Sequence, residues 1–274
     1  MDPLTHIIAV IQARLAAQAH PLLFRIAGAQ GSGKSTLAAK LTAVFAAQGV
    51  RTAAFSIDDL YHTRAQRKVL AAQIHPLLAT RGVPGTHDLM LGNQLLDALT
   101  AAGPKTETKL PVFDKSRDDR VPCQQQKVFQ GRPQLIICEG WCMGARPQSK
   151  DALAAPINEL ERDSDPDGIW RTWVNRQLKD PYRAFFDRFT LSLFLAAPGF
   201  EVVLDWRAQQ ERDSAQSNPG GTGVMDRAGL SRFIQYFERL TRHMLADQPR
   251  HANLTLALKK DRTPDRLTIR GFGL

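Results

Sequence analysis

The chain contains little cysteine and no long apolar run. Its three cysteines, Cys123, Cys138 and Cys142, are odd in number and lack Cys-x-x-Cys spacing, which favours a reducing cytoplasm over a disulfide framework. Apolar stretches such as 135–138 and 191–197 are far shorter than the roughly 20 residues that a membrane-spanning helix requires. The first five residues lack the basic region of a secretory signal. We therefore expect a soluble, cytoplasmic protein with no membrane partner.

Aromatic residues are also few, and the basic residues are scattered. Phe, Trp and Tyr make up 7% of the chain, while 36 Lys and Arg against 27 Asp and Glu give a net charge of +9. Such an excess suits nucleic acid or small anionic molecules. Because only 259–260 and nearby arginines form a dense basic tract, a dedicated nucleic-acid binder is the weaker interpretation. We expect no nucleic-acid partner.

The apolar content is sufficient for a substantial core. With 43% hydrophobic residues among 274, the chain is long enough for one large domain or two small ones, at about 150 residues per domain. Strand-like runs alternate with helical patterns and no internal repeat appears, which favours one α/β domain over 1–274. Strands are predicted at 22–27, 51–57, 134–138, 189–196, 254–258 and 267–269, and helices at 4–15, 34–47, 62–80, 89–102, 201–215 and 227–245.

Three segments of this domain are expected to have distinct roles. Residues 1–20 hold a docking helix with one apolar face, and 145–187 form a polar insertion. Residues 200–226 are the candidate lid. Within the lid, the glycine-rich run 218–223 lacks Gly-x-Gly-x-x-Gly spacing and is interpreted as a flexible connector.

The strongest motif is the run from Gly28 to Thr36, which satisfies G-x-x-x-x-G-K-[ST] between a predicted strand and a predicted helix. Its glycines let backbone N–H groups surround phosphate oxygens at the positive end of the helix. Lys34 adds a charge for the β- and γ-phosphates, and the Ser35 hydroxyl is placed to ligate Mg²⁺. The alternative is a Gly/Ser-rich turn that precedes a lysine by chance. The nucleotide-binding residues predicted from this motif are Gly28, Gln30, Gly31, Ser32, Gly33, Lys34, Ser35 and Thr36.

The segment 56–61 supplies a candidate catalytic carboxylate. It follows the second predicted strand, and ligands of open α/β sheets bind outside the carboxyl ends of the strands. Asp58 at that place is predicted to accept the proton of a substrate hydroxyl that attacks a γ-phosphoryl group, with Tyr61 beside it in the acceptor site. The alternative is a carboxylate that caps a helix N-terminus.

A second acidic residue ends the central predicted strand. The run 135–140 has the form of a Walker B strand, so Glu139 is predicted near Mg²⁺, directly or through water, and Gly140 permits close backbone approach. The alternative is a strand-terminal acid that faces solvent.

Polar loops and one helix supply the remaining candidates. Two clusters on loops suit a small polyhydroxylated or anionic acceptor, although a solvated surface explains any one of these residues nearly as well. Arg207 is the first candidate for an arginine that stabilises charge in phosphoryl transfer, and Arg212 is the second; the alternative is an exposed helical face with interleaved charges. The predicted acceptor residues, besides Asp58 and Tyr61, are Arg81, His87, Asp88, Asp114, Lys115, Arg117 and Arg120.

Taken together, these residues resemble the plant-type D-glycerate 3-kinases and their kinase-like relatives in the phosphoribulokinase/uridine kinase branch of P-loop proteins. The resemblance extends from about residue 22 to 269. Its more specific markers are Asp58-Asp59 with Tyr61, Gly85 with 87–89, 114–116 and 139–141, and it continues through Gly144, 206–207 and 210–211. The chain departs from the family pattern at Leu60, at Val112 and in a shortened loop after Ser116.

The resemblance implies a fold, an activity and cofactors. The fold is a P-loop three-layer α/β/α sandwich with a mainly parallel sheet of about five strands and a helical lid. The activity is transfer of the γ-phosphoryl group of ATP, with Mg²⁺, to D-glycerate, giving 3-phosphoglycerate. Asp58 rather than Asp59 takes the position of the base, and basic residues among Arg81, Lys115, Arg117 and Arg120 pair with the acceptor carboxylate.

Two other functions stay open on the sequence. One is a nucleoside, pantothenate or other sugar-acid kinase of the same branch. The other is a nucleotide-dependent ATPase or switch protein, although no Asn-Lys-x-Asp segment for guanine follows the later strands. The oligomeric state is not determined.

Overall fold

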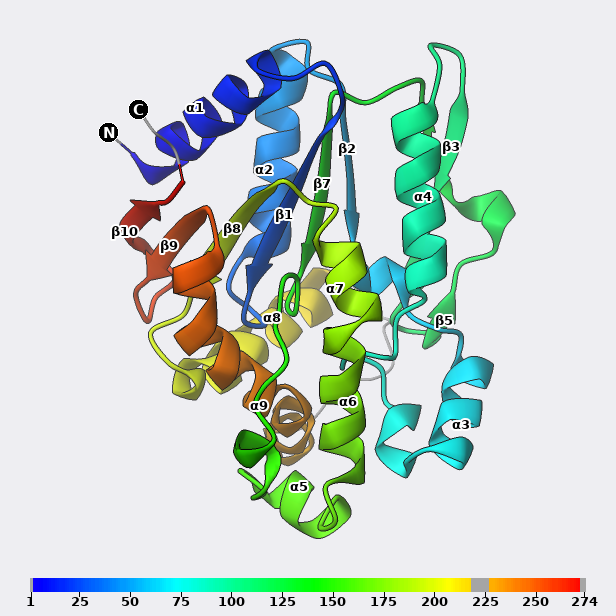
Figure 1. Cartoon of the computed structure of the whole chain (residues 1–274), viewed down its shortest axis with the longest axis vertical. Helices are drawn as coiled ribbons and strands as arrows, with labels where there is room; N and C mark the ends of the chain where they lie inside the picture. The colour runs from blue at the N-terminus through cyan, green and yellow to red at the C-terminus, as the bar shows by residue number, and fades with distance from the viewer. Residues whose placement is uncertain (1, 218–226, 272–274) are drawn as a thin grey trace.

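The computed structural model describes residues 2–217 and 227–271, and its centre is a six-stranded sheet (Figure 1). Five strands run parallel, and the last, at one edge, is antiparallel. The mainly parallel sheet is thus confirmed, with one strand more than about five because the predicted C-terminal pair adds its second member to the edge. The order is β10 (Pro264–Ile269), β9 (Leu254–Leu258), β8 (Leu191–Ala196), β1 (Leu22–Gly28), β7 (Leu135–Gly140) and β2 (Thr52–Ser56).

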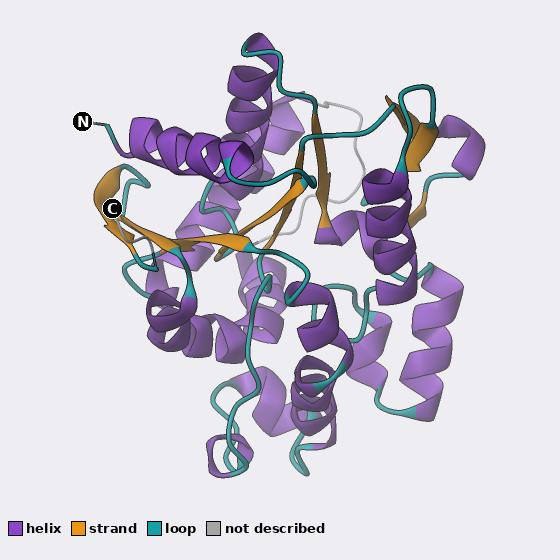
Figure 2. Cartoon of the chain, turned by 45° about the horizontal axis from the view of Figure 1, so that its top comes forward, coloured by secondary structure: helices purple, strands orange, loops and turns teal. Residues whose placement is uncertain are grey.

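Helices cover both faces of the sheet, as the three-layer prediction requires (Figure 2). The central strands are apolar on both sides because both sides are buried. In β1, for example, Phe24 and Ile26 face one apolar cluster, and Leu23 and Ala27 face the other. The first cluster packs α1 (Pro3–Ala16), α2 (Lys34–Ala47) and α8 (Val203–Ser217), the second packs α4 (Leu89–Ala101), α6 (Ile169–Lys179) and α7 (Pro181–Phe186), and α9 (Arg227–His251) contributes to both.

The N-terminal helix docks as its pattern predicts. Pro3 begins α1, where a missing N–H is tolerated. Ile7 and Ile11, one turn apart, are buried in the first cluster, and α1 lies against β10 (Figure 1).

Short elements surround the carboxyl edge of the sheet. The predicted helix 62–80 is divided into two pieces, since Ile74 and His75 leave the helical conformation before Pro76. The pieces are α3 (Arg64–Gln73) and η2 (Pro76–Ala79); the other short elements are η1 (Ile57–Leu60), η3 (Cys123–Gln125), η5 (Phe200–Val202) and the hairpins β3 (Glu107–Leu110) with β6 (Lys127–Gln130) and β4 (Phe113–Asp114) with β5 (Asp119–Arg120).

The segment 145–187 is not a merely polar insertion. It folds into η4 (Asp151–Leu153), α5 (Glu159–Ser164), α6 and α7, and it contributes buried residues such as Tyr182 and Phe185 to the core. Its polarity is misleading because charges are buried in pairs: Arg171 binds Asp165 at 2.9 Å. The prediction overlooked apolar residues at helical spacing among these charges.

The candidate lid is described only in part. Its predicted helix corresponds to η5 and α8, while the glycine-rich run 218–223 lies outside the described residues. The next helix, α9, continues to His251, six residues past the expected end. Among residues 2–217 and 227–271, no helix is both long and apolar enough to cross a membrane.

Candidate active site

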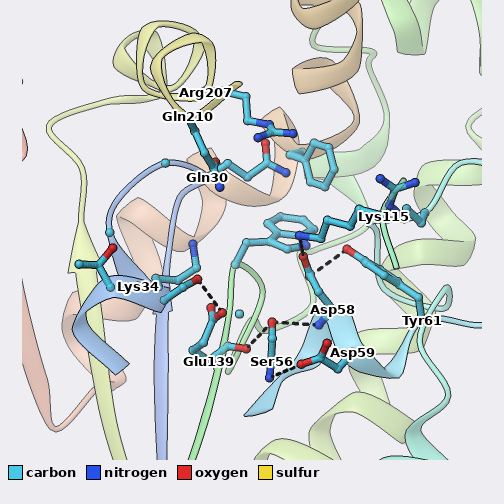
Figure 3. Close-up of a pocket in the computed structure, with 18 of the residues that line it drawn as sticks. Gln30, Lys34, Ser56, Asp58, Asp59, Tyr61, Lys115, Glu139, Arg207 and Gln210 are labelled. Atoms are coloured by element: carbon cyan, nitrogen blue, oxygen red, sulfur yellow. Dashed lines mark hydrogen bonds and ion pairs between the residues drawn. The ribbon is translucent and has the colours of Figure 1, made fainter. Parts of the chain in front are cut away.

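The register of the parallel strands brings three motifs to one edge of the sheet. Ile26 of β1 lies beside Glu139 of β7, and Glu139 lies beside Ser56 of β2. The loop after β1 and the turn after β2 therefore flank the end of β7. They line a cavity of about 340 Å³ (Figure 3).

The loop 28–36 has the shape of a phosphate-binding loop. Gly31 and Gly33 have φ of 73° and 88°, which residues other than glycine rarely adopt. Gly33 is the N-cap of α2. Lys34 is 8% exposed, and its ammonium donates to the Ala29 carbonyl at 2.9 Å. Burial lowers the pKa of Lys34, and the nearby carboxylates of Glu139 and Asp58 raise it in part. A cation and a helix N-terminus thus face the cavity, an arrangement that attracts phosphate.

Ser35 and Glu139 are in contact. The Ser35 hydroxyl donates to Glu139 Oε1 at 2.8 Å, and Glu139 is 9% exposed (Figure 3). Gly140 follows, and a Cβ there would lie 2.3 Å from Ile57 Cγ2, so the close approach expected at Gly140 is present. A hydroxyl and a carboxylate at this point are the hard oxygen donors that Mg²⁺ prefers.

Asp58 lies in η1, across the cavity from Lys34 (Figure 3). Its Oδ1 accepts from the Tyr61 hydroxyl at 2.9 Å, and its Oδ2 accepts from the Lys115 ammonium at 2.7 Å. Burial alone would raise the pKa of Asp58, but the charge and hydrogen bond of Lys115, with smaller effects of His87 and Tyr61, lower it to about 2. The carboxylate is therefore ionised at neutral pH.

Asp59 also lines the cavity, but its carboxylate oxygens bind backbone groups. Its Oδ2 accepts from the Ser56 N–H at 3.0 Å, and its Oδ1 accepts from the Phe113 N–H at 3.3 Å. Asp59 thus completes the capping box that begins η1 and ties β4 to it. The helix-capping alternative applies to Asp59, and Asp58 is the carboxylate of this turn that binds the cavity side chains of Tyr61 and Lys115.

Cationic and aromatic groups complete the walls. Arg81 pairs with Asp118, and Arg207 of α8 lies 5.9 Å from the ring centroid of Phe233. The predicted residues that the structure brings to the cavity are Gln30, Gly31, Gly33, Lys34, Ser35, Thr36, Asp58, Tyr61, Arg81, Lys115, Glu139 and Arg207.

Three predicted acceptor residues lie outside the cavity wall and contact Tyr61 and the start of α4. His87 is buried, stacks on the Tyr61 ring with centroids 4.5 Å apart, and shares a 2.6 Å hydrogen bond between Nδ1 and the Tyr182 hydroxyl. Asp88 caps α4 and pairs with Arg120 at 2.9 Å, while Arg120 donates to the Tyr61 carbonyl at 2.7 Å. These side chains do not line the cavity because the fold uses them to hold Tyr61 and the start of α4.

The remaining predicted residues also lie outside the cavity wall. Asp114 accepts from the N–H and hydroxyl of Ser116, which holds a tight turn, and Arg117 is exposed on that turn. Arg212, the second arginine candidate, bonds Gln209 on the exposed side of α8. Gly28 packs against Leu195 and Ser32 is buried in the loop, so neither lines the cavity.

Several wall residues were not predicted as site residues. Asp59 and Gln210 stood inside quoted motifs, and Phe233 and Phe237 follow helical spacing that indicates core. Arg262 lies in the β9–β10 turn and reaches the loop 28–36 at the Gly31 carbonyl. The sequence around Arg262 does not indicate this contact. The wall residues without a prediction are Ser56, Asp59, Gly140, Trp141, Gln210, Phe233, Phe237 and Arg262.

Fold and site together define the chain as a P-loop kinase. No family model matches the sequence. An uncharacterized kinase, mug58, of Schizosaccharomyces pombe is 32% identical over 201 residues, which are 71% of each chain. The chloroplastic D-glycerate 3-kinase of Arabidopsis thaliana is 26% identical over 89% of this chain and 54% of its own. A D-glycerate 3-kinase structure from Cryptococcus neoformans var. grubii has the same fold, with TM-score 0.80, 23% identity and coverage of 97% and 98%.

The chain belongs to the kinase family that contains the Schizosaccharomyces pombe and Arabidopsis thaliana proteins. It is an ATP-dependent small-molecule kinase, a phosphotransferase with an alcohol group as acceptor.

Proposed function

We propose that the chain phosphorylates D-glycerate at the 3-hydroxyl, with ATP as donor and Mg²⁺ as cofactor. The observation that carries the proposal is the meeting of Asp58, Lys115 and Arg81 in one cavity with the phosphate-binding loop. Two cations beside a carboxylate suit an acceptor that carries a hydroxyl and an anionic group. The names of the Arabidopsis thaliana and Cryptococcus neoformans relatives support glycerate as that acceptor.

The donor end of the cavity is assigned to the triphosphate. Lys34 and the N–H groups at the start of α2 bind the β- and γ-phosphates. Ser35 and Glu139 fit Mg²⁺ because they present a hydroxyl and a carboxylate side by side. No group of three acidic, histidine or cysteine side chains suited to a metal occurs in the described part of the chain. Phosphate and water oxygens would therefore supply the other ligands of the ion. The ion would neutralise charge on the phosphates.

Asp58 orients the acceptor hydroxyl and accepts its proton. The hydroxyl oxygen forms a bond to the γ-phosphorus while the bond from that phosphorus to the β–γ bridging oxygen breaks, which releases ADP. Arg207, on the same cavity wall, stabilises the charge that develops on the transferred group. Arg81 binds the acceptor carboxylate, and Lys115 joins it there.

A larger acceptor is the second candidate, and the aromatic wall favours it. Trp141, Phe233 and Phe237 line the cavity, and rings of this kind stack on a nucleobase. A nucleoside is therefore the alternative acceptor that this wall favours.

An acceptor panel tests the proposal. ADP release is measured with D-glycerate, L-glycerate, glycerol, uridine, pantothenate and simple sugars at equal concentrations, with and without Mg²⁺, and the phosphorylated product is identified. The expected result is the highest kcat/KM for D-glycerate and no transfer without the metal. A higher kcat/KM for uridine or pantothenate would replace D-glycerate by that class.

A further inference from the structure

Both oxygens of Asp58 are already occupied. Tyr61 donates to Oδ1 at 2.9 Å and Lys115 donates to Oδ2 at 2.7 Å. A carboxylate in this state has little capacity to accept a proton, and its pKa of about 2 reflects that. Each oxygen can still accept a second hydrogen bond, but transfer of the hydroxyl proton to Asp58 needs one of the two partners to leave.

Tyr61 is not the partner that leaves. Its side chain is 3% exposed, its ring stacks on His87, and the Phe113 ring packs edge-on at 5.3 Å. Arg120 holds its carbonyl at 2.7 Å. Because Tyr61 is fixed by contacts on several sides, its hydroxyl holds Oδ1 and positions Asp58.

Lys115 is free to move. Its side chain is 58% exposed, and Asp58 is the one hydrogen-bond partner of its ammonium among the residues that the structure describes. The pair joins an exposed lysine to a half-buried aspartate, so solvent screens it only in part. The four-carbon stem of the lysine is flexible, and its ammonium can rotate toward a second partner. A competing anion can therefore draw the ammonium away when it offers Lys115 a carboxylate in exchange.

Arg81 shows where such an anion would lie. It lines the same cavity and is held in place by its pair with Asp118, which also binds the buried Arg67 at 2.8 Å. An anionic group bound to Arg81 would present a second carboxylate to Lys115. The lysine would then exchange one carboxylate for another.

We propose that Lys115 couples acceptor binding to the competence of Asp58: the anionic group of the acceptor takes the ammonium from Oδ2, and the acceptor hydroxyl takes its place. This inference rests on the anionic acceptor of the proposed function. The hydroxyl proton then passes to Oδ2 as the bond to the γ-phosphorus forms and ADP leaves. Water carries no anionic group, leaves the Lys115–Asp58 pair intact, and is not activated. Lys115 thus protects bound ATP from hydrolysis.

Lys115→Met tests the coupling. Without the ammonium, Oδ2 is available to water, and ATP hydrolysis in the absence of acceptor should rise about tenfold or more, since a positioned base contributes at least about 10²-fold. The KM for D-glycerate should rise by roughly 10- to 100-fold, the range for loss of one charge-assisted hydrogen bond. Preference for D-glycerate over glycerol should fall accordingly.

Three further variants separate the coupling from other effects. Lys105→Met, an exposed lysine outside the cavity, should behave like the wild type, and Lys115→Arg, which keeps the charge, should keep hydrolysis low. Adding Asp58→Asn to Lys115→Met should abolish the raised hydrolysis, because the rise depends on the released carboxylate. Thermal unfolding checks that each variant is folded.

The two proposals fail in different ways. Wild-type enzyme that phosphorylates glycerol as well as D-glycerate overturns the anionic acceptor. A folded Lys115→Met enzyme whose acceptor-free hydrolysis equals that of the wild type overturns the coupling, and this assay contains no acceptor. A rise that persists in the double variant with Asp58→Asn overturns it as well.

Discussion

At the scale of single residues, Asp58 and Asp59 show how one turn separates a chemical role from a structural one. Both side chains are carboxylates on η1, yet Asp58 bonds the side chains of Tyr61 and Lys115 while Asp59 bonds two backbone N–H groups. Burial raises the pKa of Asp59, and its bonds to Ser56 and Phe113 lower it in part. Position on the turn, and not residue type, assigns the function.

The matched pair Asp58→Asn and Asp59→Asn separates these roles. Asp58→Asn should lower kcat by about 10²- to 10⁴-fold, the usual contribution of a general base, while ATP affinity stays within a few fold. Asp59→Asn should instead lower the free energy of unfolding by about 1–2 kcal/mol, since a capping acceptor is weakened. Steady-state ADP release, ATP titration and urea denaturation measure the three quantities. An Asp58→Asn enzyme with full turnover would remove Asp58 as the base.

At the scale of elements, three parts of the chain meet at the phosphate-binding loop. Trp206 of α8 packs against Gly31, where an added Cβ would lie 2.7 Å from the Trp206 Cβ. The Trp206 indole donates to the Lys260 carbonyl in the β9–β10 turn at 2.7 Å. Arg262 of the same turn reaches the Gly31 carbonyl at 3.5 Å. The helix that carries Arg207 is thus positioned by the loop and by the C-terminal hairpin.

Gly31→Ala tests this junction. The backbone there has φ of 73°, and the new methyl group meets the backbone of Trp206, so α8 must shift. We expect about 1–3 kcal/mol of lost stability and at least tenfold weaker ATP binding, about 1.4 kcal/mol, measured by denaturation and calorimetry. Gly103→Ala is the control, because its nearest neighbouring atom is 3.7 Å away and its φ is not positive. Equal behaviour of the two variants would show that α8 does not depend on the loop.

At the scale of the whole molecule, the fold encloses histidines that it keeps neutral. Burial lowers the pKa of His62 and of His243, and it lowers the pKa of His87 to about 3. In the unfolded chain these histidines therefore bind protons as the pH falls below about 6.5, whereas in the folded chain they bind them only at lower pH. The stability due to neutral His87 is complete above about pH 6.5 and is lost as the pH falls toward 3.

His87→Phe should remove one component of this acid sensitivity. Between pH 6 and pH 4, His87 contributes a loss of about 1.4 kcal/mol of unfolding free energy per pH unit in the wild type. The variant keeps an aromatic ring against Tyr61 but has no proton to take up, so its slope should be shallower by about that amount. Urea denaturation at several pH values measures both slopes, with the exposed His20→Phe as control. Parallel slopes for wild type and His87→Phe would contradict the assignment.

Features that depend on residues close together in the sequence were predicted correctly, and features that depend on contacts between distant segments were not. The loop 28–36, the apolar strands and the docking helix depend on neighbours in the chain, so their patterns indicated them correctly. The sequence placed three polar residues at the acceptor: His87, Asp88 and Arg120. In the structure they contact Tyr61 and the start of α4. Polarity alone does not distinguish a residue that binds a ligand from one that stabilises the fold. The helices in 145–187 were missed because their charges are neutralised by partners distant in sequence, such as Arg239 on Glu161.

The amino-acid sequence alone determined the phosphate-binding loop, the acidic ends of two strands and the alternation that makes a parallel sheet. These follow from local backbone freedom and from the period of apolar residues. Only the tertiary structure decided that Lys115 pairs with Asp58, that Arg262 meets Gly31, and that α9 supplies an aromatic wall. Such contacts join segments many residues apart, and their energy depends on distance in space, which spacing along the chain does not encode.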